Sequence, residues 1–174
     1  MKGLGLAAAL LILAAAARAQ DVSPITVSPP ASSVAVGPRI LVETSMGNIT
    51  IQLDPAHAPK SVANVLSYVK EKHYDGTVVY RVDKGFVIQM GSWDANVKGR
   101  GIHPGGVPLE ADNGLHNVRG SVALAHGEDP SSGSADFFIN LVDNSAALDA
   151  SPADNRDGYA VFGTVVDGMD VVDQ

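Results

Sequence analysis

The chain has 174 residues, of which 45% are apolar and 18% are charged, and this composition is typical of one globular domain with a sizeable core. The formal net charge of −7 argues against a nucleic-acid partner held by phosphate contacts. Because the chain contains no cysteine, disulfide bonds and thiolate metal sites are excluded, and core packing alone must stabilise the fold.

The N-terminus has the pattern of a secretory signal peptide. Lys2 precedes a short apolar run over residues 4–17, and Ala17-Arg18-Ala19 places small residues at both positions of the cleavage motif. A membrane anchor is the alternative, but a span needs about 20 apolar residues and this run is shorter. We therefore expect residues 1–19 to be removed on export, with no stable membrane insertion afterwards.

Residues 20–38 are rich in Ser, Pro, Val and Ala and show neither helical nor strand periodicity. They predict a disordered or extended linker, with an N-terminal arm docked on the domain as the alternative. The folded domain is expected over residues 39–174.

A β-hairpin and then a helix are predicted at the start of this domain. Within residues 40–53, apolar side chains at 49, 51 and 53 alternate with polar ones, and the turn is expected at residues 46–48. Pro59 then begins a helix, because its fixed φ suits the first helical turn. The helix is expected to end near residues 70–72 and to bury one apolar face, formed by Val62, Val65, Leu66 and Val69.

The stretch Y-R-V-D-K-G-F-V-I-Q-M-G, residues 80–91, is the most informative in the chain. We predict one strand here, which places Arg81 among apolar residues and in one segment with Phe86 and Gln89. Two interpretations follow. Either Arg81 belongs to a functional site, or it forms a structural ion pair, for which Asp136 is the candidate partner.

The rest of the chain predicts short strands separated by glycine-rich turns. Residues 93–108 indicate an irregular surface loop, and strands are expected over residues 120–125, 137–141 and 159–166. A second helix is expected to begin at Gly168. One long helix amid many short strands predicts a mostly β fold, a closed or nearly closed antiparallel barrel capped by helices.

Nucleophilic and metal-dependent catalysis find little support in the sequence. There is no cysteine and no G-x-S-x-G motif, and the five histidines show neither H-x-x-x-H nor H-E-x-x-H spacing. We therefore expect neither a metal site nor a cofactor.

Four blocks in order resemble the signature blocks of the cyclophilin-type peptidyl-prolyl cis-trans isomerases, and most of all those of the bacterial periplasmic members. The resemblance covers residues 40–174. It implies an eight-stranded antiparallel barrel with a helix at each end, and an isomerase that acts on proline-containing polypeptides and assists the folding of exported proteins in the periplasm. The blocks are Y-R-V-D-K-G-F-V-I-Q-M-G (80–91), E-A-D-N-G-L-H-N-V-R-G-S-V-A-L-A (110–125), D-F-F-I-N (136–140) and G-Y-A-V-F-G-T-V-V-D-G-M-D-V-V (158–172).

The resemblance also implies the site residues, position by position. Arg81 is expected to weaken the conjugation of the prolyl amide by hydrogen bonding within an apolar pocket. On composition alone Phe86 and Phe138 are equally consistent with an ordinary barrel core, and a non-catalytic module that binds proline-containing segments is the alternative function. The implied catalytic residues are Arg81, Phe86, Gln89 and Phe138, and the implied substrate-binding residues are Val87, Ala125, His126, Asp136, Leu148 and Tyr159.

Two departures from the family pattern matter. Asp136 stands where a glutamine usually precedes the Phe-Phe pair, so its carboxylate is expected either to orient Arg81 or to compete with substrate for its donors. The final strand that closes the family's barrel has no counterpart in the sequence. We therefore interpret the chain as C-terminally truncated and expect a monomer for the full-length protein.

Overall fold

A computed structural model describes residues 37–174. The predicted signal peptide, residues 1–19, and nearly all of the predicted linker, residues 20–38, lie outside the described residues. Both therefore stay predictions. The description begins just before the first strand.

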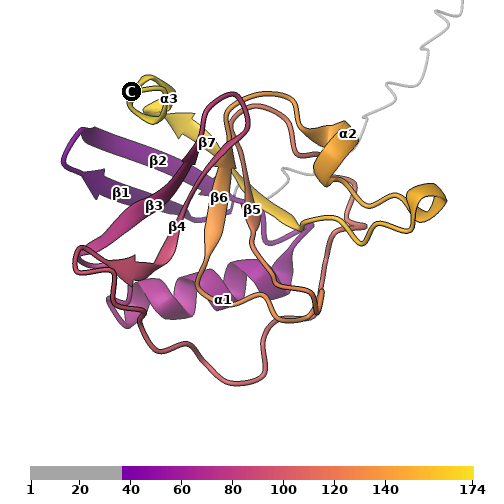
Figure 1. The fold of residues 1–174 in the computed structure, drawn as a ribbon, viewed down its shortest axis with the longest axis horizontal. Helices are drawn as coiled ribbons and strands as arrows, with labels where there is room; N and C mark the ends of the chain where they lie inside the picture. The colour runs from indigo at the N-terminus through magenta and orange to yellow at the C-terminus, as the bar shows by residue number, and fades with distance from the viewer. Residues whose placement is uncertain (1–36) are drawn as a thin grey trace, which may run out of the picture. The chain divides into compact units, whose positions relative to one another are not determined.

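The described residues form one seven-stranded antiparallel sheet in the order β1-β2-β7-β5-β6-β4-β3. The sheet curls into a half-barrel with β1 and β3 at its edges, and a long helix, α1 (Pro59–Lys70), lies against one end of it (Figure 1). The predicted mostly β, barrel-like fold is thus confirmed. The strands are β1 (Arg39–Thr44), β2 (Gly47–Leu53), β3 (Thr77–Asp83), β4 (Val87–Asp94), β5 (Ser121–Leu124), β6 (Phe137–Asn140) and β7 (Val161–Asp167).

Strands β1 and β2 form the predicted hairpin. Ile49, Ile51 and Leu53 are buried and alternate with less buried neighbours, as their spacing predicts. The turn itself is Ser45-Met46, slightly earlier than expected. Gly47 follows it with φ of +141°, and a side chain there would collide with Val171, so the close contact with the C-terminal segment requires glycine.

The prediction of one strand over residues 80–91 is wrong, because this stretch spans a second hairpin. β3 ends at Asp83 and β4 begins at Val87, and Gly85 between them has φ of +76°. In the sequence, the apolar residues on both sides obscure this turn. The hairpin places Arg81 directly opposite Gln89 in the sheet register.

Helix α1 has the predicted bounds, but its buried face differs from the prediction. Val62 and Val65 are buried as expected, whereas Val69 is 38% exposed and Tyr68 is fully buried. Tyr68 can be buried because its hydroxyl accepts a hydrogen bond from the main-chain amide of His103 at 2.8 Å. The same contact fixes the irregular loop after β4 to the helix.

The N-terminus of α1 is capped by a residue distant in the sequence. Ala58, at the cap position, offers no side-chain hydrogen bond. Instead, the carboxylate of Glu110 accepts hydrogen bonds from the amides of Lys60 and Ser61, at 3.0 and 2.8 Å, and from the Ser61 hydroxyl at 2.8 Å. Its negative charge also interacts favourably with the helix dipole.

The remaining helices are short. The second helix predicted from Gly168 is present as α3 (Met169–Val172), while α2 (Ser145–Leu148) and the 3-10 helix η1 (Pro152–Asp154) were not expected from the sequence. Beyond β4 the predicted irregular loop is confirmed. No helix in the described part of the chain is long and apolar enough to cross a membrane.

The main core lies between the sheet and α1. Apolar side chains from one face of the sheet meet Val62 and Val65 of the helix, and we call this group the main cluster. Its buried members include Ile49, Ile51, Leu53, Ile88, Met90, Val122, Leu124, Phe137, Ile139 and Phe162.

We predict that Glu110→Gln lowers the free energy of unfolding by about 1 kcal/mol, because the amide group of glutamine cannot accept all the hydrogen bonds that the carboxylate accepts. Urea denaturation measures this change. Glu43→Gln is the matched control, since Glu43 is exposed and its side chain has no hydrogen-bond partner among residues 37–174. Equal midpoints for the two variants would contradict a capping role.

Candidate active site

A second apolar cluster lies on the opposite face of β4 and β6 from the main cluster. Successive residues of a strand point to opposite faces, so Phe137 joins the main cluster and Phe138 joins the second one. The predicted site residues Phe86, Val87, Ala125, Phe138, Leu148 and Tyr159 all meet here, together with Ala123, Val161 and Leu115. The structure therefore brings together six positions that lie up to 73 residues apart in the chain.

Aromatic packing defines one wall of this second cluster. The rings of Phe138 and Tyr159 lie edge to face, with centroids 5.4 Å apart. The imidazole of His126 stacks on Tyr159, at 4.4 Å between centroids. Tyr159 thus links three predicted site residues from three separate segments by aromatic contacts.

Polar groups stand beside the second cluster, on the β3–β4 hairpin. Arg81 Nη1 donates to Gln89 Oε1 at 3.3 Å, and Arg81 Nη2 donates to Asp83 Oδ2 at 3.0 Å. The guanidinium carbon lies 5.8 Å from the centre of the Phe86 ring, within range of a cation–π contact. A cation, an amide and the apolar cluster are therefore adjacent.

The ion pair of Arg81 differs from the one considered in the sequence analysis. Its partner is Asp83, and both side chains are about half exposed, at 46% and 48%. Asp136 makes no ion pair with Arg81 within residues 37–174; its Oδ1 instead accepts the main-chain amide of Ser92 at 2.8 Å. The reason is the β4–β6 register, which pairs Phe137, the first residue of β6, with Met90, so that Asp136 lies next to the segment of β4 that follows Met90.

The segment 125–127 lies along the second cluster, held by its neighbours. The Ala125 amide donates to the carbonyl of Asp136 at 2.9 Å. Both ring nitrogens of His126 face carbonyl oxygens, Gly127 O and Gly158 O, each at 2.8 Å. In the described part of the chain, the main-chain amide and carbonyl of His126 have no hydrogen-bond partner, so they are available to a peptide.

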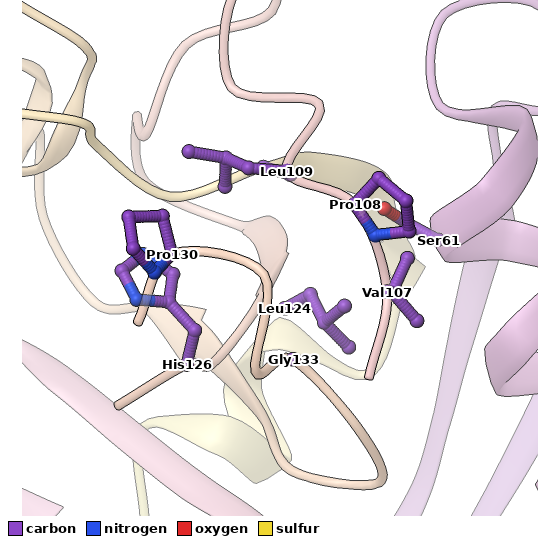
Figure 2. A pocket seen from close by; sticks show the side chains of 9 residues that line it. Ser61, Val107, Pro108, Leu109, Leu124, His126, Pro130 and Gly133 are labelled. Carbon is purple, nitrogen blue, oxygen red and sulfur yellow. The ribbon is translucent and has the colours of Figure 1, made fainter. Parts of the chain in front are cut away.

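A separate small hollow lies beside this segment. Its volume is only about 10 Å³, room for about one water molecule, and Figure 2 shows its mainly apolar lining, which includes Val107, Leu109, Leu124 and Pro130. His126 is the only predicted site residue that lines it. The hollow is therefore distinct from the surface formed by the second cluster.

Buried asparagines hold the second cluster in place, and the sequence analysis missed them. Asn144 Nδ2 donates to the carbonyl of Phe86 at 2.9 Å and to Asn140 Oδ1 at 2.8 Å. Asn140 and Asn117 are fully buried and hydrogen-bonded to each other at 3.2 Å. One signal in the sequence could have identified Asn140, namely a polar residue at the end of an otherwise apolar strand in the block D-F-F-I-N.

Asp149 fixes the position of Leu148. Its carboxylate accepts two hydrogen bonds from Asn117, at 2.8 and 2.9 Å, and one contact from the His116 ring at 2.7 Å. Burial acts to raise the pKa of Asp149, but the hydrogen bonds from Asn117 and His116 outweigh it and hold this pKa below its usual value. The ionised form is thus the one that the fold stabilises.

The described residues contain no group of three or more His, Asp or Glu side chains that could hold a metal ion. The chemistry available at the second cluster is therefore that of a guanidinium, an amide, main-chain groups and apolar rings.

The family match and the most similar sequences all point to one protein family. Residues 39–174 match the family described as "Cyclophilin type peptidyl-prolyl cis-trans isomerase/CLD". The chain is 42% identical over 150 residues to peptidyl-prolyl cis-trans isomerase A of Dickeya dadantii, covering 86% of this chain and 77% of that protein. It is 40% identical over 135 residues to peptidyl-prolyl cis-trans isomerase B of Escherichia coli, covering 78% and 82%.

Solved structures agree on the fold. The chain is similar to a cyclophilin type peptidyl-prolyl cis-trans isomerase of Cryptosporidium parvum determined in the presence of the dipeptide Ala-Pro, with a TM-score of 0.64, 22% identity and coverage of 79% of this chain and 85% of that one. It is also similar to the cyclophilin AquaCyp293 of Hirschia baltica, with a TM-score of 0.65, 20% identity and coverage of 78% and 66%.

We predict that Asp149→Asn lowers the free energy of unfolding at pH 7 by about 1–2 kcal/mol, because the carboxylate hydrogen bonds are weakened. Since the pKa of Asp149 is lowered in the fold, its stabilising effect is present above about pH 4 and is lost as the pH falls through the folded-state pKa.

The difference between Asp149→Asn and the unaltered chain should therefore shrink below about pH 4, as measured by urea denaturation across a pH series. Asp157→Asn serves as the control at pH 7, since Asp157 is exposed and its side chain has no hydrogen-bond partner in the part of the chain described. A difference that stays constant down to pH 2 would contradict the role given to the Asp149 carboxylate.

Proposed function

The chain belongs to the cyclophilin-type peptidyl-prolyl cis-trans isomerase family and is an enzyme of that class, and we propose that Arg81 and the second cluster form its active site. One observation carries this proposal. The guanidinium of Arg81, hydrogen-bonded to Gln89, stands beside an apolar cluster that contains the partly buried Phe86 and the buried Phe138.

The chemistry requires no proton transfer. Rotation about a prolyl peptide bond is slow because the amide has partial double-bond character, with a barrier of about 18–20 kcal/mol. In the twisted transition state the prolyl nitrogen regains its lone pair. A guanidinium that donates a hydrogen bond near this nitrogen stabilises the twisted state more than the planar one, which lowers the barrier.

The hydrogen bond from Arg81 is too weak to account for the whole rate acceleration of an isomerase. A charge-assisted hydrogen bond contributes about 1.5–3 kcal/mol, whereas a million-fold acceleration requires about 8 kcal/mol. We assign the remainder to the second cluster, where Phe86, Phe138 and Leu148 would hold the pyrrolidine ring away from water. Exclusion of water also strengthens the hydrogen bond from Arg81.

The contact between Arg81 and Asp83 is compatible with this role. Both side chains are about half exposed, and exposed ion pairs of this kind contribute only about 0–1 kcal/mol. A peptide can therefore displace Asp83 at small cost. Gln89 stays beside the guanidinium on the neighbouring strand and limits its rotation.

Main-chain groups supply the remaining contacts in this proposal. The amide and carbonyl of His126 have no partner within residues 37–174, and the side chain of His126 is fixed by Tyr159 and by two carbonyl groups. An extended peptide that pairs with this segment would place its proline over the second cluster. Asp136, which contacts Ser92 and not Arg81, does not compete directly for the donors of Arg81 in this arrangement.

We further propose that the substrates are exported proteins and that the enzyme works in the periplasm. Export is supported by Lys2, the apolar run over residues 4–17 and the Ala17-Arg18-Ala19 motif. The periplasm is supported by the resemblance of the signature blocks to those of the bacterial periplasmic members.

We predict that Arg81→Ala lowers kcat/KM for a proline-containing peptide by about 10- to 100-fold, the loss expected for one charge-assisted hydrogen bond. A protease-coupled isomerisation assay measures this. Arg81→Lys should retain an intermediate rate, because lysine keeps the charge but lacks the planar fork of donors.

Arg39→Ala provides the matched control. Arg39 also pairs across a hairpin with a glutamine, donating from Nε to Gln52 Oε1 at 2.8 Å, but it lies on β1 and outside the second cluster. This variant should keep the activity of the unaltered chain. Equal kcat/KM values for Arg81→Ala and the unaltered chain would contradict the role proposed for Arg81.

We predict that the full chain, expressed in a bacterial host with a periplasm, is recovered from that compartment and begins at Gln20. Mass spectrometry of the intact protein measures the cleavage site. Recovery of the uncleaved chain in the cytoplasm would overturn the proposed export, and it would leave the proposed active site unaffected.

A further inference from the structure

Tyr80, a residue with no role assigned so far, lies beside Arg81 and Gln89. Its hydroxyl accepts a hydrogen bond from Gln89 Nε2 at 2.5 Å, while Gln89 Oε1 accepts from Arg81 Nη1 at 3.3 Å. The amide of Gln89 therefore bridges the guanidinium and the phenol. Gln89 can form this bridge only when both the guanidinium of Arg81 and the hydroxyl of Tyr80 are present.

A β-bulge explains how two consecutive residues of one strand reach the same amide. In a regular strand, Tyr80 and Arg81 would point to opposite faces of the sheet. Here Val79 lies opposite Met90 and Arg81 lies opposite Gln89, so Tyr80 is an extra residue without a partner in the register. Bulges of this kind redirect side chains, and this one turns the phenol toward Gln89.

The orientation of the Gln89 amide follows from its neighbours. A guanidinium has only donors, so the oxygen of the amide must face Arg81 and the NH₂ group must face Tyr80. The phenol oxygen thereby becomes an acceptor, and its own O–H is left to donate elsewhere. Arg81 thus donates a hydrogen bond to Gln89, and Gln89 donates one to Tyr80.

The phenol stays protonated. Burial and the negative charge of Asp136 raise the pKa of Tyr80 to about 12. Trp93 packs edge to face against Tyr80, with ring centroids 6.2 Å apart, and holds the phenol ring in place.

We propose that Tyr80 is a positioning residue for the isomerase reaction, acting on Arg81 through the amide of Gln89. Because the phenol oxygen accepts from the NH₂ group of Gln89, the amide cannot turn over, and its oxygen stays in place as an acceptor for Arg81. Gln89 and Asp83 then accept from the two terminal nitrogens of the guanidinium and hold it in one orientation. The proposal rests on the proposed role of Arg81.

The expected gain in catalytic rate comes from holding the Arg81 side chain in its productive orientation. A free arginine side chain samples many rotamers, and holding it in the productive one removes that loss of entropy from the transition state. The effect should therefore appear in kcat more than in KM. Loss of stability should be small, because Tyr80 is 38% exposed.

Three variants test the proposal by kcat and KM in the isomerisation assay, namely Tyr80→Phe, Gln89→Ala and the double variant. Tyr80→Phe keeps the ring and removes the hydroxyl, and it should lower kcat by about 3- to 10-fold with little change in KM. In the double variant the loss should equal that of Gln89→Ala alone, because Tyr80 acts on Arg81 only through Gln89.

Tyr74→Phe is the matched control. Its hydroxyl donates to the carbonyl of Ala135 at 3.0 Å, next to Asp136, but it takes no part in the chain of hydrogen bonds to Arg81. This variant should lower the melting temperature and keep kcat. A purely structural role for Tyr80 would instead make Tyr80→Phe resemble Tyr74→Phe.

The outcomes separate this proposal from the proposed function. If Arg81→Ala is impaired while Tyr80→Phe keeps full kcat, or if the losses of the single variants multiply in the double variant, the positioning role is overturned and the role of Arg81 stands. If the unaltered chain and Arg81→Ala have the same rate, the role of Arg81 fails, and this proposal fails with it.

Discussion

The structure depends on strand β6, which is buried on both of its faces. All four of its residues are buried, and the strand pairs with β4 on one side and β5 on the other. The alternation of a strand sends Phe137 and Ile139 into the main cluster against α1, and it sends Phe138 and Asn140 to the opposite face. One strand thereby supports the fold and the candidate site at once, and a change in its register would disrupt both.

The face that carries Phe138 differs from an ordinary core in its polar supports. Asn140 and Asn144 link β6 to the carbonyl of Phe86, while Asn117 and Asp149 fix the position of Leu148. Because buried polar groups are costly when unpaired, such a network specifies one arrangement of the apolar side chains around it. The guanidinium of Arg81, in contrast, stays about half exposed, so its orientation depends on hydrogen bonds and not on packing.

The bulge in β3 connects these two features. It gives Tyr80 and Arg81 a common partner in Gln89, which itself lies opposite Phe138 in the sheet. The guanidinium therefore sits on the strand pair that also carries the apolar surface.

Local periodicity and motifs are enough to predict the β1–β2 hairpin, the start of α1 at Pro59 and the family. Through the family resemblance they also predict six of the residues that meet in the second cluster, but not Ala123, Val161 and Leu115. The sequence did not show that residues 80–91 fold back as a hairpin, that Tyr68 replaces Val69 in the core, that Glu110 caps α1, or that Arg81 pairs with Asp83 and Asp136 with Ser92. Most of these contacts join residues distant in the chain, and their choice depends on strand register and on which polar groups become buried together. Those are properties of the packed molecule, and only the tertiary structure decides them.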